Sequence, residues 1–287
     1  MRNPRTSGDD TRARIASARG FIFDMDGTIA LGDRTSGGHE ALPGAIELIA
    51  RIKRDNIPVR IFTNGTAKPP AAYAASLRGA GFDVEDEEMM TPSSSTAAWL
   101  VARGINRVRV LGTAGTSAPL LAKGIEVIGP SEQADGVQAV YLGWHREFTF
   151  RDLEAAVQDV LAGAVAVTAS NVPFFATADG RAMGTSYAMN AVVRAYLGRL
   201  PRILGKPSRD AFFCALASMG LKRRDASDVV VVGDDPALEM RMANAVGAIS
   251  VGVATGLSGL AALKGLPERD RPMLALSGVG ELLEMVG

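Results

Sequence analysis

The sequence has little cysteine, no excess of charge and no long apolar run. Cys214 is the single cysteine among 287 residues, so neither an internal disulfide nor a cysteine zinc cluster can form. Lysine plus arginine number 31 and aspartate plus glutamate number 31, which leaves no basic surplus to neutralise a nucleic-acid backbone. No apolar stretch approaches the roughly 18 residues that a membrane helix needs. These absences argue against nucleic-acid and membrane partners and predict a soluble, cytoplasmic protein.

The composition is otherwise that of an ordinary globular protein. Hydrophobic residues make up 47% of the chain and charged residues 22%, which is enough apolar material for a sizeable core. A chain of 287 residues lies where polypeptides begin to divide into two domains, so two are expected. Residues 1–17 are polar and charged without an apolar period, and we expect them to form a flexible tail.

From Gly20 onward, short β-rich runs alternate with amphipathic stretches. Strands are expected at 21–23, 59–62, 108–111, 125–128, 137–143, 165–168, 203–204, 229–232 and 249–253, and helices at 43–55, 69–79, 150–161, 209–219 and 236–246. This alternation is typical of βαβ units around a parallel sheet. The last third returns to the pattern of the first. We therefore predict an α/β fold with a doubly wound parallel-sheet core and a second α/β layer inserted into it.

The strongest chemical signal is Asp24-Met25-Asp26-Gly27-Thr28, directly after the apolar run 21–23. Ligands bind at the carboxyl ends of parallel strands, so both carboxylates are expected where chemistry takes place. One can act as a nucleophile while the other transfers protons, and a cation is needed to hold both charges together. The alternative is a simple Asp-Gly turn after a strand.

Three more polar loops follow predicted strands. They are Thr63-Asn64-Gly65 after 59–62, Gly205-Lys206-Pro207-Ser208 after 203–204, and Gly233-Asp234-Asp235 after 229–232. In this order, the four loops resemble the four motifs of the haloacid dehalogenase (HAD) superfamily. The long interval between Thr63 and Lys206 is similar to subfamily IIA, the NagD-type, 4-nitrophenylphosphatase and phosphoglycolate phosphatase group. That resemblance implies a Rossmann-like HAD core at 18–100 and 200–287 and an α/β cap at 101–199.

The resemblance also implies a phosphomonoesterase mechanism. Asp24 would attack phosphorus to give an aspartyl-phosphate. Asp26 would protonate the leaving alcohol and then activate water. Because haloalkanoate dehalogenases lack this second aspartate, its presence favours phosphate over halide. Lys206 would offer its positive charge to the phosphoryl group.

Phosphate and metal binding are assigned to the same loops. The Thr63 hydroxyl and the backbone N–H groups of Asn64 and Gly65 would bind the phosphate oxygens. Asp24, the backbone carbonyl of Asp26, and Asp234 would hold Mg²⁺, which usually keeps several waters.

Two departures from the family pattern stand out. Many relatives carry an aspartate where this chain has Glu239, and we expect Asp235 and Glu239 to lie near metal-bound water. In the cap, Asn171-Val172-Pro173 lacks the aspartate of the Asn-Pro-Asp found in relatives. Trp144, His145, Arg146 and Asn171 are the candidate substrate contacts of the cap, although a packed strand end explains the first three equally well.

His39 follows the first motif in a glycine-containing loop that could gate the site, but a single loop histidine is usually solvated. The expected substrate is a small phosphomonoester, and the expected cofactor is Mg²⁺. Two alternatives to hydrolysis remain open, a phosphate-binding regulatory protein with little turnover and a phosphotransferase. By resemblance, a homodimer through the cap is plausible.

Overall fold

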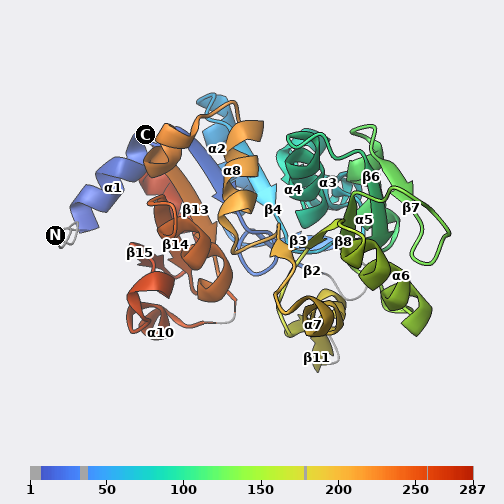
Figure 1. The fold of residues 1–287 in the computed structure, drawn as a ribbon. Helices are drawn as coiled ribbons and strands as arrows, with labels where there is room; N and C mark the ends of the chain where they lie inside the picture. The colour runs from blue at the N-terminus through green and yellow to red at the C-terminus, as the bar shows by residue number, and fades with distance from the viewer. Residues whose placement is uncertain (1–7, 33–37, 178–179, 257, 287) are drawn as a thin grey trace. The chain divides into compact units, whose positions relative to one another are not determined.

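The structure is a computed structural model that describes residues 8–32, 38–177, 180–256 and 258–286 (Figure 1). Its described residues form two compact units. The core unit draws on Met1–Thr63, Tyr73–Met89 and Ala215–Gly287, and the cap unit on Asn64–Ala72 and Met90–Cys214. The expected cap limits, 101 and 199, stay a prediction.

A six-stranded sheet in the order β15-β14-β13-β1-β4-β5 forms the centre of the core unit. Its strands are β1 (Gly20–Phe23), β4 (Val59–Phe62), β5 (Met89–Met90), β13 (Val229–Gly233), β14 (Ile249–Val253) and β15 (Leu274–Leu276). The pairs from β15 to β4 are parallel, and β1 lies between β13 and β4. N-terminal and C-terminal segments therefore share one sheet, as the colours of Figure 1 show. The parallel α/β prediction is confirmed.

Alternating side chains of these strands build the core. Phe21 and Phe23 of β1 belong to the same buried cluster as Val230 and Val232 of β13. Successive strand residues point to opposite sheet faces, so these four side chains share one face. The helix α2 (Ala45–Arg54) adds the buried Ala45, Leu48, Ile49 and Ile52, spaced as on one helical face. The helix predicted at 43–55 is thereby confirmed.

The remaining helical elements of the core unit have ten residues or fewer. They are α1 (Gly8–Ala16), α3 (Pro70–Gly79), η1 (Asp86–Glu88), α8 (Arg209–Ser218), η2 (Arg223–Asp228), the π-helical η3 (Pro236–Met240), α9 (Arg241–Asn244), α10 (Leu260–Lys264), η4 (Glu268–Asp270) and η5 (Val279–Glu284). Two of them, α3 and α8, begin in the cap unit. The helix expected at 236–246 is thus a π-helical turn followed by one α-helical turn.

The prediction of a flexible tail over 1–17 is wrong for residues 8–16, while 1–7 lie outside the described residues. Residues 8–16 form α1, whose Ile15 is only 1% exposed and belongs to the main core cluster. Arg14 also donates a 2.9 Å hydrogen bond to the carbonyl of Ser227. A few tertiary contacts from a mostly polar helix are enough to order it, and a polar composition does not reveal them.

A second parallel sheet, in the order β12-β9-β8-β6-β7, forms the cap unit. Its strands are β6 (Arg107–Leu111), β7 (Glu126–Ile128), β8 (Ala139–Leu142), β9 (Val165–Thr168) and β12 (Arg202–Ile203), and a separate hairpin comprises β10 (Phe174–Thr177) and β11 (Gly180–Met183). The helices are α4 (Pro92–Val101), α5 (Ala114–Leu121), α6 (Phe150–Leu161) and α7 (Thr185–Leu197).

Helices cover both faces of the cap sheet. Tyr141 of β8 packs in a cluster with Trp99 of α4 and Leu120 of α5. Its neighbour Val140 packs in another cluster with Leu153 of α6 and Met189 of α7. Adjacent residues of β8 thus serve opposite layers, which explains why this strand is fully buried.

Within the part of the chain that the structure describes, no helix is long and apolar enough to cross a bilayer.

Candidate active site

Asp24 and Asp26 lie where β1 ends, at the carboxyl edge of the core sheet. Asp24 is 9% exposed, and its backbone N–H continues the pairing by donating to the carbonyl of Val232 on β13. The side chain of Asp26 is 55% exposed. The turn between them and β2 (Ala30–Gly32) is closed by a hydrogen bond from the N–H of Gly27 to the carbonyl of Ala30. One carboxylate is therefore buried while the other faces solvent.

Asp234 lies at the end of β13, the strand beside β1, and is 6% exposed. Two glycines approach its carboxylate closely. A Cβ at residue 27 would lie 2.7 Å from Oδ2 of Asp234, and one at residue 256 would lie 1.7 Å from the same atom. Gly27 also has a φ of 83°, which strongly favours glycine. The Thr255 hydroxyl donates to the Gly27 carbonyl over 2.6 Å and joins the two glycine segments.

The Thr28 hydroxyl brings the two buried carboxylates together. Its Oγ1 lies 3.3 Å from Oδ2 of Asp24 and 3.5 Å from Oδ1 of Asp234. Two buried carboxylates beside one hydroxyl concentrate negative charge, which a bound cation would offset.

The donor set fits Mg²⁺. Among the described residues, no three His, Cys, Asp or Glu side chains gather closely enough to hold a metal by themselves. Mg²⁺ does not need such a cage, because it usually keeps several waters and binds through one or two carboxylates. Asp24 and Asp234 supply carboxylate oxygens of the kind it prefers, and the Asp26 backbone carbonyl, two residues after Asp24 in the chain, is the third candidate oxygen.

Asp235 and Glu239 are engaged with the backbone. Oδ1 of Asp235 accepts the N–H of Ala237 over 2.8 Å and caps η3. Glu239 is 1% exposed, and its Oε2 accepts the N–H of Asp235 over 3.2 Å. A Cβ at Gly233 would lie 2.3 Å from Cγ of Glu239, so the absence of a side chain there gives the glutamate its room. Contact of either residue with metal-bound water stays a prediction.

The loop after β4 contains Thr63, Asn64 and Gly65. Thr63 belongs to the core unit and is 5% exposed. In the cap unit, the Asn64 side chain joins this loop to the loop after β12. Its Nδ2 donates to the carbonyl of Lys206 over 3.0 Å, and its Oδ1 accepts the N–H of Lys206 over 2.9 Å. The sequence motif predicts a role for the Asn64 backbone alone, and the structure adds this role for its side chain.

Lys206 is 1% exposed, which is rare for a lysine. The preceding Gly205 lies against the Ala169 backbone and the Asn64 side chain. A Cβ there would lie 2.2 Å from the Ala169 carbonyl oxygen and 2.8 Å from Oδ1 of Asn64. The Ser208 hydroxyl accepts the N–H of Ala211 over 3.1 Å at the start of α8. The glycine, lysine and serine of this loop therefore have separate roles.

Two threonines of the cap unit hold the loop that follows Gly65. The hydroxyls of Thr113 and Thr116, at the start of α5, lie 3.3 and 3.2 Å from the carbonyl oxygen of Thr66. A Cβ at Gly115 would lie 2.4 Å from the backbone of Lys68, so α5 can approach this closely only with glycine there. Sequence reasoning missed this support, because three small residues carry no recognisable motif.

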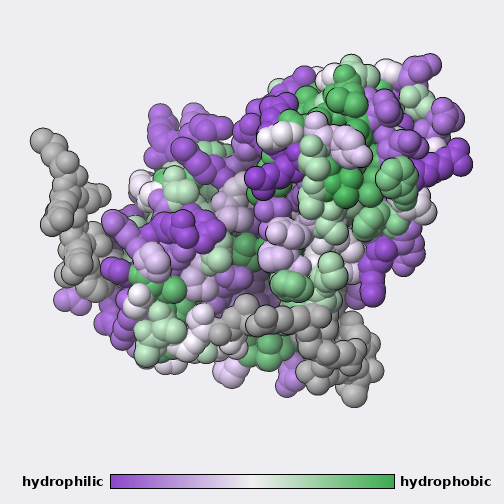
Figure 2. Space-filling view, turned by 60° about the horizontal axis from the view of Figure 1, so that its bottom comes forward, coloured by the Kyte–Doolittle hydropathy of each residue, from purple (hydrophilic) through white to green (hydrophobic). Residues whose placement is uncertain are grey.

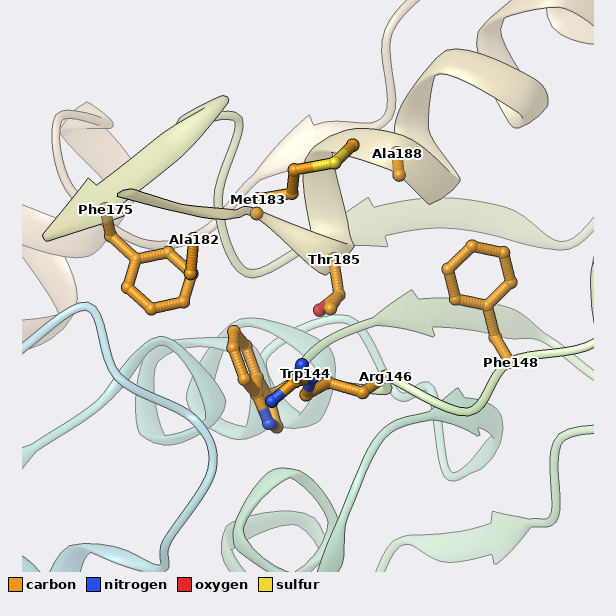
Figure 3. A pocket seen from close by; sticks show the side chains of 9 residues that line it. Trp144, Arg146, Phe148, Phe175, Ala182, Met183, Thr185 and Ala188 are labelled. Atoms are coloured by element: carbon orange, nitrogen blue, oxygen red, sulfur yellow. The ribbon is translucent and has the colours of Figure 1, made fainter. Parts of the chain in front are cut away.

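The cap unit contains a pocket of about 580 Å³ (Figure 3). It is lined by Trp144, Arg146, Phe148, Phe175, Ala182, Met183, Gly184, Thr185 and Ala188. Trp144 and Phe175 meet edge to face, with ring centres 5.2 Å apart. In Figure 3 the Thr185 hydroxyl lies between this aromatic pair and Phe148. The pocket is thus largely apolar, with one guanidinium and one hydroxyl.

His145 and Asn171 are not among the pocket-lining residues. Nε2 of His145 lies 3.6 Å from Oδ2 of Asp152. Burial raises the pKa of Asp152, but hydrogen bonds from the backbone and hydroxyl of Thr149, together with Ser131 and His145, hold that pKa below its ordinary value. Oδ1 of Asn171 accepts a 3.1 Å hydrogen bond from the buried Asn190. The structure therefore brings Trp144 and Arg146 to the pocket and engages the other two candidates elsewhere.

Two family models match this chain. The haloacid dehalogenase-like hydrolase model matches residues 21–126, and the HAD-hydrolase-like model matches residues 203–282. The chain belongs to the haloacid dehalogenase-like hydrolases. Within them it is a phosphatase of the NagD and p-nitrophenyl phosphatase type, as the resemblance of the four motifs predicts.

Individual relatives cover most of the chain. The sugar-phosphatase AraL of Bacillus subtilis is 27% identical over 84% of both proteins. The structure of 4-nitrophenylphosphatase from Thermotoga maritima has a TM-score of 0.82 at 25% identity and covers 96% of this chain and 99% of its own. A glycerol phosphate phosphatase from Mycobacterium tuberculosis in complex with magnesium has a TM-score of 0.76 at 25% identity, covering 92% of this chain and 75% of its own.

Proposed function

We propose that this HAD-family phosphatase is a Mg²⁺-dependent phosphomonoester hydrolase that acts through an aspartyl-phosphate on Asp24. The observation that carries the proposal is the meeting of Asp24 and Asp234 beside the Thr28 hydroxyl, at the ends of neighbouring parallel strands. A magnesium-containing relative and the sugar-phosphatase AraL support the same chemistry.

In the first step, a carboxylate oxygen of Asp24 attacks phosphorus and the ester P–O bond breaks. Asp26 gives its proton to the departing alkoxide oxygen, so that a neutral alcohol leaves. In the second step, Asp26 takes a proton from water, and the water oxygen attacks phosphorus. The bond between phosphorus and Asp24 breaks, which restores the carboxylate and releases phosphate. The different environments of the two carboxylates suit this division, since the exposed side chain of Asp26 can exchange protons with solvent.

Asp24, Asp234 and the backbone carbonyl of Asp26 would hold Mg²⁺, whose charge offsets those of the carboxylates and the phosphate when it is bound. The cradle around Asp234 formed by Gly27 and Gly256 fixes one of these oxygens. Thr63, Asn64 and Gly65 are assigned to phosphate binding. Lys206 is assigned to the developing charge on the phosphoryl group, and its support by Asn64 fits a residue that must be held in one position.

The substrate class that we infer is a small phosphorylated metabolite. Relatives of this chain act, by their names, on sugar phosphates and on D-glycerol 3-phosphate. The pocket that contains Trp144 and Arg146 is assigned to the choice of leaving group, because its apolar walls and single charge can discriminate among small alcohols.

A homodimer through the cap is also part of the proposal. Large hydrophobic side chains are exposed in the cap unit, among them Phe174 (52%), Met183 (67%) and Phe150 (74%). Figure 2 shows hydrophobic side chains interspersed with hydrophilic ones on the face it draws. Sedimentation equilibrium of the purified chain would give the oligomeric state directly.

Phosphate release from a panel of metabolite monoesters tests the proposed function. The purified chain is assayed with Mg²⁺ and with EDTA, beside Asp24→Asn. Metal-dependent release that Asp24→Asn abolishes is the expected result. No release from any monoester would favour a binding protein. Transfer of phosphate to added alcohols in place of water would identify a phosphotransferase.

A further inference from the structure

His39 has a buried side chain beside the proposed acid of the reaction. Its side chain is 8% exposed, and its Nε2 lies 3.4 Å from Oδ1 of Asp26. On the other side of the ring, Nδ1 lies 2.7 Å from the hydroxyl of Ser76 on α3. All three residues belong to the core unit. The expectation of a solvated loop histidine is therefore wrong.

A short hairpin couples His39 to the turn that carries Asp26. His39 begins β3 (His39–Ala41), which pairs with β2 in the register Gly32↔His39 and Ala30↔Ala41. Ala30 in turn forms a bridge with Asp26 and accepts the N–H of Gly27. Two hydrogen-bonded steps, from β3 to β2 and from Ala30 to the Asp26 turn, thus connect the backbones of His39 and Asp26. Their side chains lie 3.4 Å apart.

Burial does not fix the conformation of the Asp26 side chain, so a contact such as that with His39 is needed to restrict it. More than half of its surface is exposed, so its carboxylate could rotate among several rotamers. A general acid works only when its proton lies within hydrogen-bonding distance of the leaving oxygen. A ring held between Ser76 and Asp26 reduces that rotational freedom.

We propose that His39 is a positioning residue that holds the Asp26 carboxylate for proton transfer to the leaving group, with Ser76 fixing the imidazole. The inference rests on the proposed hydrolase function. The Ser76 hydroxyl can donate to Nδ1 or accept from it, so the imidazole can accept from Asp26 or donate to it. The contact is therefore available both when the carboxyl group carries a proton and when it does not.

The dependence of rate on the leaving group tests this role. An alkyl phosphate such as glycerol phosphate releases a basic alkoxide that needs the proton from Asp26. The nitrophenolate of 4-nitrophenyl phosphate leaves without one. In His39→Ala, kcat for the alkyl phosphate is expected to fall on the order of tenfold, while kcat for the aryl phosphate and both KM values stay near the parent values.

Two matched variants complete the series. His39→Gln keeps an amide nitrogen near the position of Nε2 and is expected to restore much of the alkyl phosphate rate. Glu40→Ala removes an exposed side chain from the next position of the same strand and is expected to change neither rate. Equal losses on both substrates in His39→Ala, or no loss on either, would overturn the inference while leaving the hydrolase function intact. A parent chain inactive toward every monoester would overturn both.

A second readout needs no turnover. The chain has two histidines, so ¹⁵N-histidine labelling gives the ring-nitrogen signals of two imidazoles, and those of His145 serve as an internal reference. Asp26→Ala is expected to shift the His39 ring nitrogens and leave those of His145 unchanged. An unchanged His39 signal in this folded variant would show that the contact does not exist in solution and would overturn the inference.

Discussion

Gly256 lies so close to Asp234 that a side chain at position 256 would overlap the carboxylate, with Cβ 1.7 Å from Oδ2. No rearrangement of Cβ alone can relieve this overlap, because the neighbouring atom is a buried carboxylate that Gly27 approaches from another segment. The position of a proposed Mg²⁺ ligand is thus set by two residues that have no chemistry of their own.

Gly256→Ala is expected to displace Asp234 and to lower kcat/KM on the order of 100-fold, since a small misplacement of a ligand carries a large kinetic cost. The apparent affinity for Mg²⁺ should fall in parallel. Titration of phosphatase activity with Mg²⁺ measures both effects. Gly259→Ala is the control, because a Cβ there meets nothing within 4 Å. Equal behaviour of the two variants would contradict the assignment.

Asn64→Ala removes both hydrogen bonds to the Lys206 backbone and leaves a part-buried N–H and carbonyl without that partner. We expect the free energy of unfolding to fall by about 1–3 kcal/mol and kcat to fall with it. Asn64→Asp should lose activity too, because a carboxylate would face the Lys206 carbonyl oxygen. Urea unfolding and steady-state kinetics measure the two effects, with the exposed Asn106→Ala as control. Full activity of Asn64→Ala would show that this bridge does not support Lys206.

Tyr141 predicts a loss of stability at high pH. Burial raises its pKa from 10.0 to about 12, against the opposing effect of its 3.1 Å hydrogen bond with Ser93. Because the folded-state pKa is raised, the stabilisation is fully present below the unfolded value of about 10 and disappears as the pH rises toward 12. The free energy of unfolding of the parent, measured with denaturant, should therefore fall between pH 10 and pH 12.

The free energy of unfolding of Tyr141→Phe should fall less over the same interval, since the phenylalanine ring does not ionise. At neutral pH it should be less stable than the parent by about 1–2 kcal/mol, because the buried Ser93 hydroxyl loses its partner. If the free energies of unfolding of the parent and of Tyr141→Phe fell by the same amount between pH 10 and pH 12, Tyr141 ionisation would not be the cause of the loss.

Arg146 is the only charged residue among the nine that line the described cap pocket. Arg146→Ala is expected to lower kcat/KM on the order of tenfold for monoesters whose leaving group carries a carboxylate, and to spare 4-nitrophenyl phosphate. Its exposed position predicts an unchanged melting temperature. A uniform change across the panel would remove Arg146 from substrate selection.

The sequence predicts the helices and strands whose capping residues and apolar spacing agree with the way they pack in the fold. The stretch 150–161 is predicted and observed as α6 because Thr149 and Asp152 form a capping box ahead of an apolar period. By contrast, α4 begins with Pro-Ser-Ser-Ser-Thr, which favours a loop, and α5 contains Pro119. Both helices pack on the cap sheet. The start of α4 also has a local signal, the capping box of Thr91 and Ser94, which its serine-rich composition obscures.

The candidate site divides in the same way. Strand ends followed by aspartates predict where Asp24 and Asp234 lie. The sequence could not reveal that Asn64 binds Lys206 through its side chain, because 142 positions separate them. Nor could it show that Gly256 and His39 approach the two acidic loops, since each contact depends on how distant segments pair. Residues that support the chemistry are harder to predict than the residues that perform it.

In the proposed mechanism, Asp24 carries the phosphoryl group during turnover. Borohydride reduces an acyl phosphate, and so converts the modified aspartate to homoserine. The chain is mixed with substrate and Mg²⁺, quenched rapidly, reduced, digested and mapped by mass spectrometry. Homoserine at position 24, absent when substrate or Mg²⁺ is omitted, is the predicted result. Modification at another carboxylate, or none at Asp24 during measured phosphate release, would contradict the mechanism.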